Sequence, residues 1–492
     1  MAGEQDYYKL LGVPRDATQE QIRRAYREAA LRLHPDRNVR PGETELFVGV
    51  NRAYEVLNDP ARRGEYDKEL RAAEAETAEK SGFRCTVLHS RKALLQLDEP
   101  QVHYLLFDVT PAPGFKVIRP PVNLCIVVDR STSMRGQRLD QVRSAAQAVL
   151  DQLDASDHAA IIAFSDRAEV VVAPDQAKDR SVSRARLSLL QAGGGTAIAQ
   201  GLETGLTQLR QSFQRDGVNH LLLLTDGRTY GDEAACLEMA DRSVTDGITI
   251  SGIGIGSDWN DRFLDDLTSR TGGAAIFLDT PRAVTALLQK TFDDLGRVFA
   301  NRVRLEGAFA PQVDVRSAFR LHPDPTPLSD ALPLVLGHLG RDDSIRLLLE
   351  LVIHAIGPIH ELPLASLKVA GDLLGQAPDN PPLAIEIRCP VTGEPEHEPP
   401  PPEILATLNL VSLYRMQEKA RHEAELGQAS LAARRLENLA THLLASGERE
   451  LAKAALGEAE RLVHTRHLST EGEKRLKYGT RALLLPSKSG AP

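Results

Sequence analysis

The sequence lacks the features that mark proteins which bind nucleic acid. Aromatic residues make up only 4% of its 492 residues, and 68 acidic residues outnumber 59 basic ones, which gives a formal net charge of −9 at pH 7. Proteins that bind nucleic acid use basic surfaces to neutralise phosphates, and those that bind single strands also use stacking aromatic rings. We therefore expect no nucleic-acid partner.

Long apolar runs are also absent. No stretch approaches the roughly 18 consecutive apolar residues that a membrane-spanning helix requires, so no membrane span is expected. The first residues, MAGEQDYYKLLGV, do not place a basic start before an apolar core, so we expect no secretory signal peptide. Both absences favour a cytoplasmic protein.

Cysteine is scarce, and the motifs of several enzyme classes are missing. Cys85, Cys125, Cys236 and Cys389 lie far apart and form no C-x-x-C pair, which argues against a disulfide framework or a zinc site. We expect them to be small buried hydrophobic residues. The chain has no G-x-x-x-x-G-K-[ST] loop, no H-E-x-x-H motif and no Ser-His-Asp set that can be ordered from the sequence. We therefore expect that the protein is not an enzyme.

What is present is the composition of a globular protein, with 42% hydrophobic and 26% charged residues. The length predicts about three domains. In the middle of the chain, apolar runs of strand length alternate with amphipathic helical segments, which predicts a doubly wound α/β domain. Strand-like runs lie on both sides of it. We infer that they form one sandwich into which the α/β domain is inserted, because insertion is common where domain ends lie close together. Two separate small sheets remain the alternative.

The prediction is therefore a multidomain chain. Its expected parts are an all-α domain (5–70), a charged linker (71–82), a β-sandwich made from two segments (83–121 and 301–390), the inserted α/β domain (122–300), a proline-rich linker (391–402) and an α-helical bundle (403–485).

A basic helix is predicted over residues 18–33. Thr18 is its expected N-cap, and Gln21 completes a capping box. Apolar residues recur three or four positions apart and form one buried stripe: Ile22, Ala25, Tyr26, Ala29 and Leu33. Beside that stripe, three arginines share one sector of the helix and form an exposed basic face: Arg23, Arg24 and Arg27.

The helix is expected to end at His34-Pro35-Asp36, because the residue before a proline is disfavoured in helical backbone. This tripeptide, the basic helix and the flanking runs DYYKLLGV, NRAYEVLNDP and RRGEYD resemble the J-domain of the DnaJ family. The resemblance implies that His34, Pro35, Asp36 and the basic face engage a DnaK-type chaperone and stimulate its ATP hydrolysis. Glu28 departs from the family, whose members usually carry a basic or polar residue there. The other modules of full DnaJ proteins are absent, so the resemblance implies a recruitment module.

Oxygen-bearing side chains follow two of the predicted strands of the α/β domain. The run VNLCIVV ends at Asp129, and Ser131 and Ser133 follow it. The later strand HLLLLT leads directly to Asp226, and three glycines precede Thr196. In open α/β sheets ligands bind at the carboxyl ends of the strands, so these side chains are expected to share one site.

This pattern resembles the metal-ion-dependent adhesion site of von Willebrand factor A domains. The resemblance implies that Mg²⁺, or Mn²⁺, is held by five residues: Asp129, Ser131, Ser133, Thr196 and Asp226. Magnesium prefers oxygen ligands in octahedral array. Hydroxyl ligands neutralise little of the charge of the ion, so the site is expected to attract a carboxylate from an acidic segment of a client protein.

Together these features predict an adaptor. Its J-domain would stimulate a DnaK-type chaperone, and its A domain would bind a protein partner in a magnesium-dependent way. Two alternatives stay open: an assembly factor that works with an AAA-type ATPase, and a scaffold whose J-domain is inactive.

Overall fold

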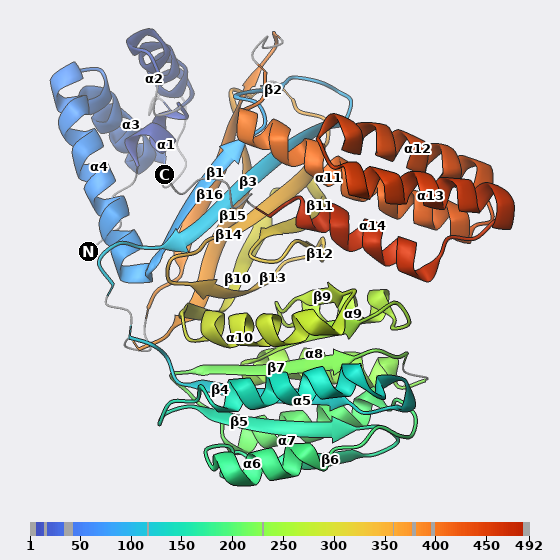
Figure 1. Ribbon diagram of the computed structural model, residues 1–492. Helices are drawn as coiled ribbons and strands as arrows, with labels where there is room; N and C mark the ends of the chain where they lie inside the picture. The colour runs from blue at the N-terminus through green and yellow to red at the C-terminus, as the bar shows by residue number, and fades with distance from the viewer. Residues whose placement is uncertain are drawn as a thin grey trace.

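The structure is a computed structural model that describes residues 6–13, 17–33, 43–115, 118–228, 231–357, 359–375, 380–394 and 399–485. Figure 1 shows an N-terminal helical domain and a C-terminal helical domain placed on different sides of a β-rich middle, with an α/β domain below it. The predicted fold class, an α/β domain inserted in a β-sandwich with a helical domain at each end, is confirmed.

The N-terminal domain is built from helices around a small aromatic and aliphatic core. Its helices are α1 (Tyr7–Leu11), α2 (Gln19–Leu33), α3 (Glu43–Leu57) and α4 (Pro60–Ser81). The expected capping box starts α2: the Gln21 backbone N–H donates to Thr18 Oγ1 at 3.3 Å, and the Thr18 N–H donates to Gln21 Oε1 at 2.7 Å. Across α2 and α3, the rings of Tyr26 and Tyr54 stack with centroids 4.0 Å apart.

The segment 71–82, expected to be a linker, is almost entirely helical. The helix that begins at Pro60 runs through this segment as α4 and ends at Ser81. The run RAAEAETAEK is rich in alanine and glutamate, which are strong helix formers, so its charged composition does not interrupt the helix. Gly82, with φ of +75°, then turns the chain into the first strand.

The sandwich is one domain divided by the insertion. One sheet has the order β1-β3-β14-β11-β12 and the other β13-β10-β15-β16-β2. Strand β3, which precedes the α/β domain, pairs with β14, which follows it, so that Leu105 lies opposite Leu349. The strands are β1 (Phe83–His89), β2 (Leu94–Leu95), β3 (Gln101–Pro111), β10 (Val298–Phe309), β11 (Val313–His322), β12 (Thr326–Leu328), β13 (Leu334–Gly340), β14 (Ile345–Ile353), β15 (Glu361–Leu373) and β16 (Leu383–Thr392).

The α/β domain has a sheet of order β6-β5-β4-β7-β8-β9, parallel except for β6. Its strands are β4 (Val122–Asp129), β5 (His158–Phe164), β6 (Ala168–Val172), β7 (Val218–Thr225), β8 (Ile248–Ile255) and β9 (Ala275–Leu278). Its helices are η1 (Thr132–Met134), α5 (Gln137–Leu150), α6 (Arg180–Ser188), α7 (Ile198–Gln211), α8 (Glu233–Asp246), α9 (Asp261–Arg270), η2 (Pro281–Ala283) and α10 (Val284–Leu295).

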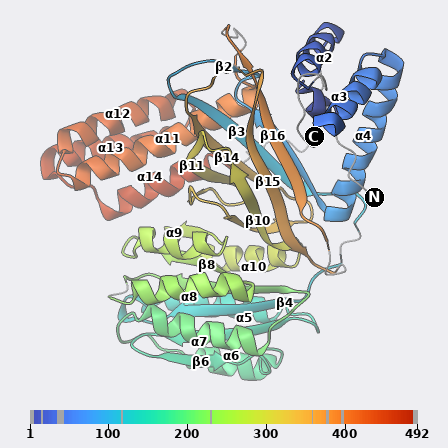
Figure 2. The same ribbon diagram turned by 180° about the vertical axis from the view of Figure 1, so that it is seen from behind.

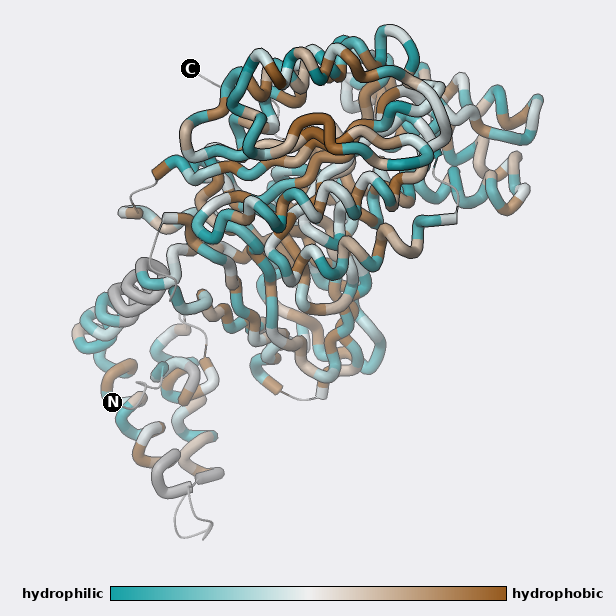
Figure 3. The backbone as a smooth tube through the Cα atoms, turned by 90° about the horizontal axis from the view of Figure 1, so that it is seen from below, coloured by the Kyte–Doolittle hydropathy of each residue, from teal (hydrophilic) through white to brown (hydrophobic). Residues whose placement is uncertain are grey.

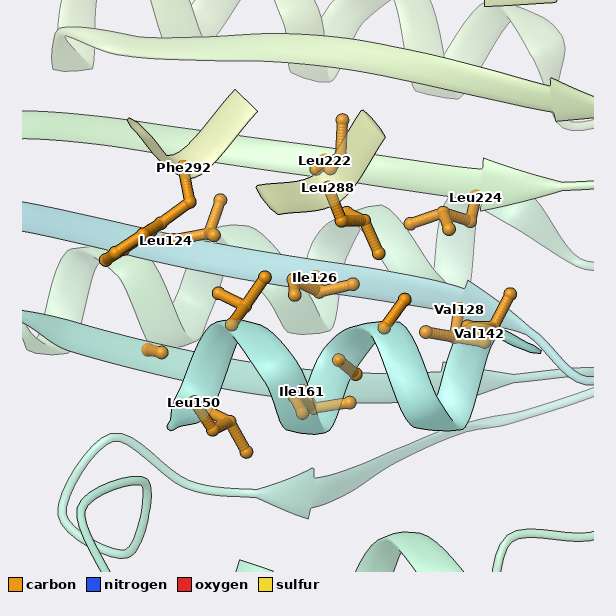
Figure 4. Close-up of a cluster of buried hydrophobic side chains, with 14 of the residues drawn as sticks. Leu124, Ile126, Val128, Val142, Leu150, Ile161, Leu222, Leu224, Leu288 and Phe292 are labelled. Atoms are coloured by element: carbon orange, nitrogen blue, oxygen red, sulfur yellow. The ribbon is translucent and has the colours of Figure 1, made fainter. Parts of the chain in front are cut away.

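Alternate residues of the central strand β4 enter the two cores of this domain. Leu124, Ile126 and Val128 face α5 and α10, as Figure 4 shows, while Cys125 and Val127 pack with α7 on the other face. A strand buried on both faces reads as one apolar run, which is why VNLCIVV has no polar alternation. In Figure 3 the hydrophobic stretches likewise gather between outer helices that are largely hydrophilic.

The C-terminal bundle consists of α11 (Pro402–Glu425), α12 (Ala429–Ala445), α13 (Arg449–Thr465) and α14 (Thr470–Ala482). The expected proline-rich linker is shorter than predicted at its start, because Val391 and Thr392 still belong to β16 and pair with β2. Helix α11 packs on the sandwich through Ile404, Val411 and Tyr414. Figure 2 shows from behind that the bundle and the N-terminal domain lie on opposite sides of the sandwich.

Candidate functional site

The structure brings the five predicted oxygen-bearing residues to the carboxyl edge of the α/β sheet. Asp129 is the last residue of β4, and its Oδ1 accepts the backbone N–H of Ser131 at 2.8 Å. The Ser133 hydroxyl donates to Asp226 Oδ1 at 2.7 Å, and the Ser131 and Ser133 hydroxyl oxygens are 3.0 Å apart. Both aspartates are fully buried, whereas Ser133 is exposed. The site therefore has a buried acidic floor and an open rim of hydroxyls.

Thr196 reaches this edge from the glycine loop. A Cβ atom added at Gly227 would meet the Thr196 hydroxyl oxygen at 3.1 Å and Asp129 Oδ2 at 3.8 Å, so Gly227 leaves open the space between these two groups. The loop is held in place because the Gly194 carbonyl accepts both the backbone N–H and the hydroxyl of Thr132. Glycine is required at 194, where φ is +89°.

Burial has the largest influence on the pKa of the Asp129 carboxyl group. It raises the pKa of the Asp129 carboxyl to about 6, against the hydrogen bonds from Ser131 and Thr225, and the neighbouring Asp226 raises it further. A carboxyl group held away from water beside a second one is stabilised in its charged form by a nearby cation. The arrangement therefore favours binding of a positive charge.

Two residues of this site were not predicted from the sequence. The Thr225 hydroxyl donates to Asp129 Oδ2 at 2.7 Å and so connects β7 to β4. The Arg138 guanidinium, from the first turn of α5, forms an ion pair with Asp226 Oδ2 and bonds the Ser133 carbonyl at 3.3 Å. The position of Thr225 directly before Asp226 was the available signal for the first, whereas nothing in the sequence singled out Arg138 among the exposed arginines.

The donor set fits magnesium. It consists of two carboxylates and three hydroxyls, all of them the hard oxygen donors that this ion prefers, and the space at Gly227 lies between two of them. The binding of a metal ion stays a prediction.

The predicted basic face lies on α2 and is exposed. Arg23, Arg24 and Arg27 all reach solvent, although Arg23 also bonds Asn58 Oδ1 at 3.0 Å. The tripeptide His34-Pro35-Asp36 lies outside the described residues, so its placement relative to this face stays a prediction.

Helix α2 also faces the sandwich. The Glu28 carboxylate, the residue that departs from the family pattern, pairs with Arg24 at 3.0 Å and with the His360 ring at 3.1 Å. A groove runs between the two domains, with Gly12, Arg24 and Glu28 on one side and His360 and Arg388 on the other. One edge of the basic face is therefore close to the sandwich.

Across the part of the chain that the structure describes, no helix combines the length and apolar character needed to cross a membrane.

Family models match three segments of the chain. A DnaJ domain matches residues 6–67, a von Willebrand factor type A domain matches residues 123–291, and a domain described as Sll0103-like, C-terminal alpha-helical matches residues 402–486.

Relatives match the same segments. The uncharacterized protein sll0103 of Synechocystis sp. is 28% identical over 333 residues, which cover 65% of this chain and 78% of that protein. The chaperone protein DnaJ of Methanosarcina thermophila is 52% identical over 68 residues, and this chain spans only 18% of its length. Among solved structures, a von Willebrand factor type A protein from Catenulispora acidiphila has a TM-score of 0.66 at 16% identity and covers 81% of this chain and 96% of its own, which shows a shared fold.

Proposed function

We propose that this chain, a DnaJ-type J-domain fused to a von Willebrand factor A domain and a C-terminal helical domain, is a co-chaperone adaptor. Its J-domain stimulates a DnaK-type chaperone, and its A domain selects a client protein. The chain acts by binding and not as an enzyme, and it works in the cytoplasm beside its chaperone.

The observation that carries this proposal is that an exposed basic helix face and an oxygen-bearing site, open to solvent at Ser133, lie on separate domains of one chain. The arginines of α2 face solvent at one end of the molecule, and the oxygen cluster of Asp129 and Asp226 opens at the sheet edge of the A domain (Figure 1). Surfaces placed apart can be occupied at the same time. A client protein bound at the A domain is then kept near the chaperone that the J-domain recruits. This raises the effective concentration of the client at the chaperone.

In the A domain, Asp129, Ser131, Ser133, Thr196 and Asp226 would hold magnesium or manganese. The bound ion would supply an electrophilic centre that attracts a carboxylate of an acidic client segment. The protein residues prepare the site: Thr225 and the Ser131 backbone orient Asp129, and Ser133 bridges to Asp226. The exposed rim at Ser133 leaves an approach for the client side chain.

The J-domain half of the proposal is tested by the ATPase activity of a purified DnaK-type chaperone. The full chain should stimulate it, and His34→Gln should abolish the stimulation. The chain offers a matched control, because His322 begins a second His-Pro-Asp tripeptide at the end of β11, without a basic helix before it. His322→Gln should stimulate like the wild type. Equal stimulation by His34→Gln and the wild type would favour the scaffold with an inactive J-domain.

The A-domain half is tested by calorimetric titration of magnesium. We expect heat of binding in the wild type and a large loss of affinity in Ser133→Ala, whose side chain is exposed and contributes little packing. Ser144→Ala is the control, because the Ser144 hydroxyl donates to the Asp140 carbonyl of its own helix and is not one of the five proposed ligands. Capture of client proteins should require magnesium and be lost with EDTA. Capture that is equally strong in EDTA would refute the metal-dependent contact, and enrichment of an AAA-type ATPase would favour the assembly-factor alternative.

A further inference from the structure

A second group of metal-binding side chains lies inside the β-sandwich, far from the A-domain site. His89 ends β1, His103 is near the start of β3, and Cys389 is in β16 of the facing sheet. One potential ligand atom from each residue lies within 4.8 Å of the other two. The cluster sits at the end of the sandwich near β2, opposite the A domain (Figure 1).

The alternation of each strand explains why the three side chains meet. Most inward positions of β1 and β3 are apolar: Phe83 and Val87 in β1 and Leu105 and Phe107 in β3 belong to the sandwich core. His89 and His103 continue these inward series at the strand ends. Cys389 follows Ile387 on the inward face of β16. Two imidazoles and a thiol therefore occupy places that the pattern would otherwise give to hydrophobic residues.

We propose that His89, His103 and Cys389 bind a zinc ion that connects the two sheets of the sandwich. Zinc takes imidazole nitrogen and thiolate sulfur at about 2.0–2.1 Å and 2.3 Å, so neighbouring ligand atoms in a tetrahedral site lie roughly 3.3–3.6 Å apart. His89 Nδ1 and His103 Nε2 are 3.1 Å apart, close to that separation. Three protein ligands leave the fourth position to water, and the half-buried His89 gives water access.

Hydrogen bonds from neighbouring residues orient the proposed zinc ligands. The Ser90 hydroxyl oxygen lies 3.3 Å from His103 Nδ1 and accepts the Tyr104 N–H at 2.9 Å, so His103 can donate from Nδ1 and offer its Nε2 lone pair toward His89. On binding, the Cys389 thiol releases its proton to solvent and coordinates as the thiolate.

Spacing along the chain concealed this cluster. The two histidines come from before the inserted A domain and the cysteine from after it, so no short motif joins them. The zinc site would lie directly behind the groove that faces α2. Arg388 and Pro390 line that groove, whereas Cys389, between them in the sequence, points the other way into the core. A zinc ion would fix the strand that the J-domain faces.

Cobalt titration of the full chain tests the proposal, because a cobalt–thiolate bond gives a charge-transfer absorption that an all-oxygen site cannot produce. All samples contain excess magnesium to fill the A-domain site. We expect the band in the wild type, its displacement by zinc, and its loss in Cys389→Ser. Cys85→Ser is the matched control, since Cys85 also points inward from β1 but lies outside the cluster, and it should keep the band.

Ser90→Ala gives a graded test, because loss of a hydrogen bond to a ligating histidine weakens metal affinity by about 10–100-fold. Zinc should also raise the melting temperature of the wild type and not that of Cys389→Ser. A wild type that gives no band and retains no zinc after dialysis would overturn the proposal and leave a hydrogen-bonded histidine pair in the core. Persistence of the band in a folded Cys389→Ser protein would overturn it as well.

Discussion

The two helical ends of this chain are held to the middle by different kinds of contact. The C-terminal bundle meets the A domain through buried charges: Asp261 and Asp265 of α9 pair with Arg421 of α11 and with Lys477 and Arg481 of α14. Helix α2 of the J-domain meets the sandwich through the exposed pair Glu28–His360, whose side chains are 48% and 71% exposed. The end of α4 adds one contact, in which Asn380 Nδ2 donates to the Ser81 carbonyl at 3.3 Å. Loss of one partner of a buried charge pair strongly destabilises the folded protein, whereas exposed pairs contribute little to its stability.

The buried junction also sets the charge of its own groups. Burial would raise the pKa of the Asp261 carboxyl, but Arg421 and Lys477 lower it more, so it stays below its usual range. Lys474 extends the junction by donating to the Trp259 carbonyl at 2.6 Å. We infer that the bundle and the A domain behave as one body, whereas the J-domain is held less firmly to the sandwich.

Breaking the buried junction between the A domain and the bundle should cause the largest loss in the free energy of unfolding. Asp265→Asn removes the anionic partner of Arg481 and one of the two anionic partners of Lys477, two side chains that are 5% and 2% exposed. Removal of one partner of a buried pair costs about 3–5 kcal/mol. Urea unfolding measures this loss through the fluorescence of Trp259, the only tryptophan in the sequence, whose ring lies against Tyr478 with centroids 5.8 Å apart.

The neighbouring Asp266 supplies the control for that experiment. Its side chain lies on the exposed side of α9, so Asp266→Asn should change the free energy of unfolding by no more than about 0.5 kcal/mol. An equal loss in the two variants would show that the charge pairs do not hold the bundle to the A domain.

Acid should weaken a third junction, between the A domain and the sandwich, by a smaller amount. Burial, with the neighbouring His338, lowers the pKa of His220 from 6.5 to about 3. Between these values the unfolded chain binds a proton that the folded chain does not, so the free energy of unfolding decreases as the pH falls. The decrease is up to about 1.4 kcal/mol per pH unit, or about 2 kcal/mol from pH 7 to pH 5.

The variant His220→Leu isolates this contribution. It should lessen the pH dependence of urea unfolding between pH 7 and pH 5 without abolishing it, because burial also lowers the pKa of the neighbouring His338, to about 4, and this second group keeps its own contribution. His464→Leu, at an exposed position of α13, should leave the dependence of the wild type intact. A slope that stays the same in His220→Leu would mean that other groups cause the acid sensitivity.

The junctions also mark the limit of what the sequence could predict. Local patterns predicted the Thr18 capping box and the strand that ends at Asp129, because periodicity and capping depend on neighbouring residues. The insertion was predicted from strand-like runs on both sides of the α/β segment. The pair Arg481–Asp265 could not be predicted, because it joins residues that are 216 positions apart in the sequence. The sequence does not show whether an arginine on a helix surface contacts solvent or a buried aspartate of another helix.

The residues of the A-domain site also differ in whether the sequence could predict them. The five oxygen-bearing residues could be predicted because each follows a strand or a glycine run. Arg138 could not, because its contact with Asp226 depends on how α5 is oriented over the sheet. The segment 71–82 was predicted only as a charged linker, and the structure adds that it is helical up to Ser81, as its alanine and glutamate content favours.

The exposed junction of the J-domain should give the smallest effect. The double variant Glu28→Gln with His360→Ala removes the pair between α2 and the sandwich, and exposed pairs contribute about 0–1 kcal/mol. The free energy of unfolding should therefore change far less than in Asp265→Asn, and high salt should remove even this difference, because salt screens exposed charges. Arg24→Gln alone is the matched control, since it breaks the pair within α2 but keeps the pair between Glu28 and His360. A loss as large as that of Asp265→Asn would contradict the comparison and show that the J-domain is fixed on the sandwich as firmly as the bundle is on the A domain.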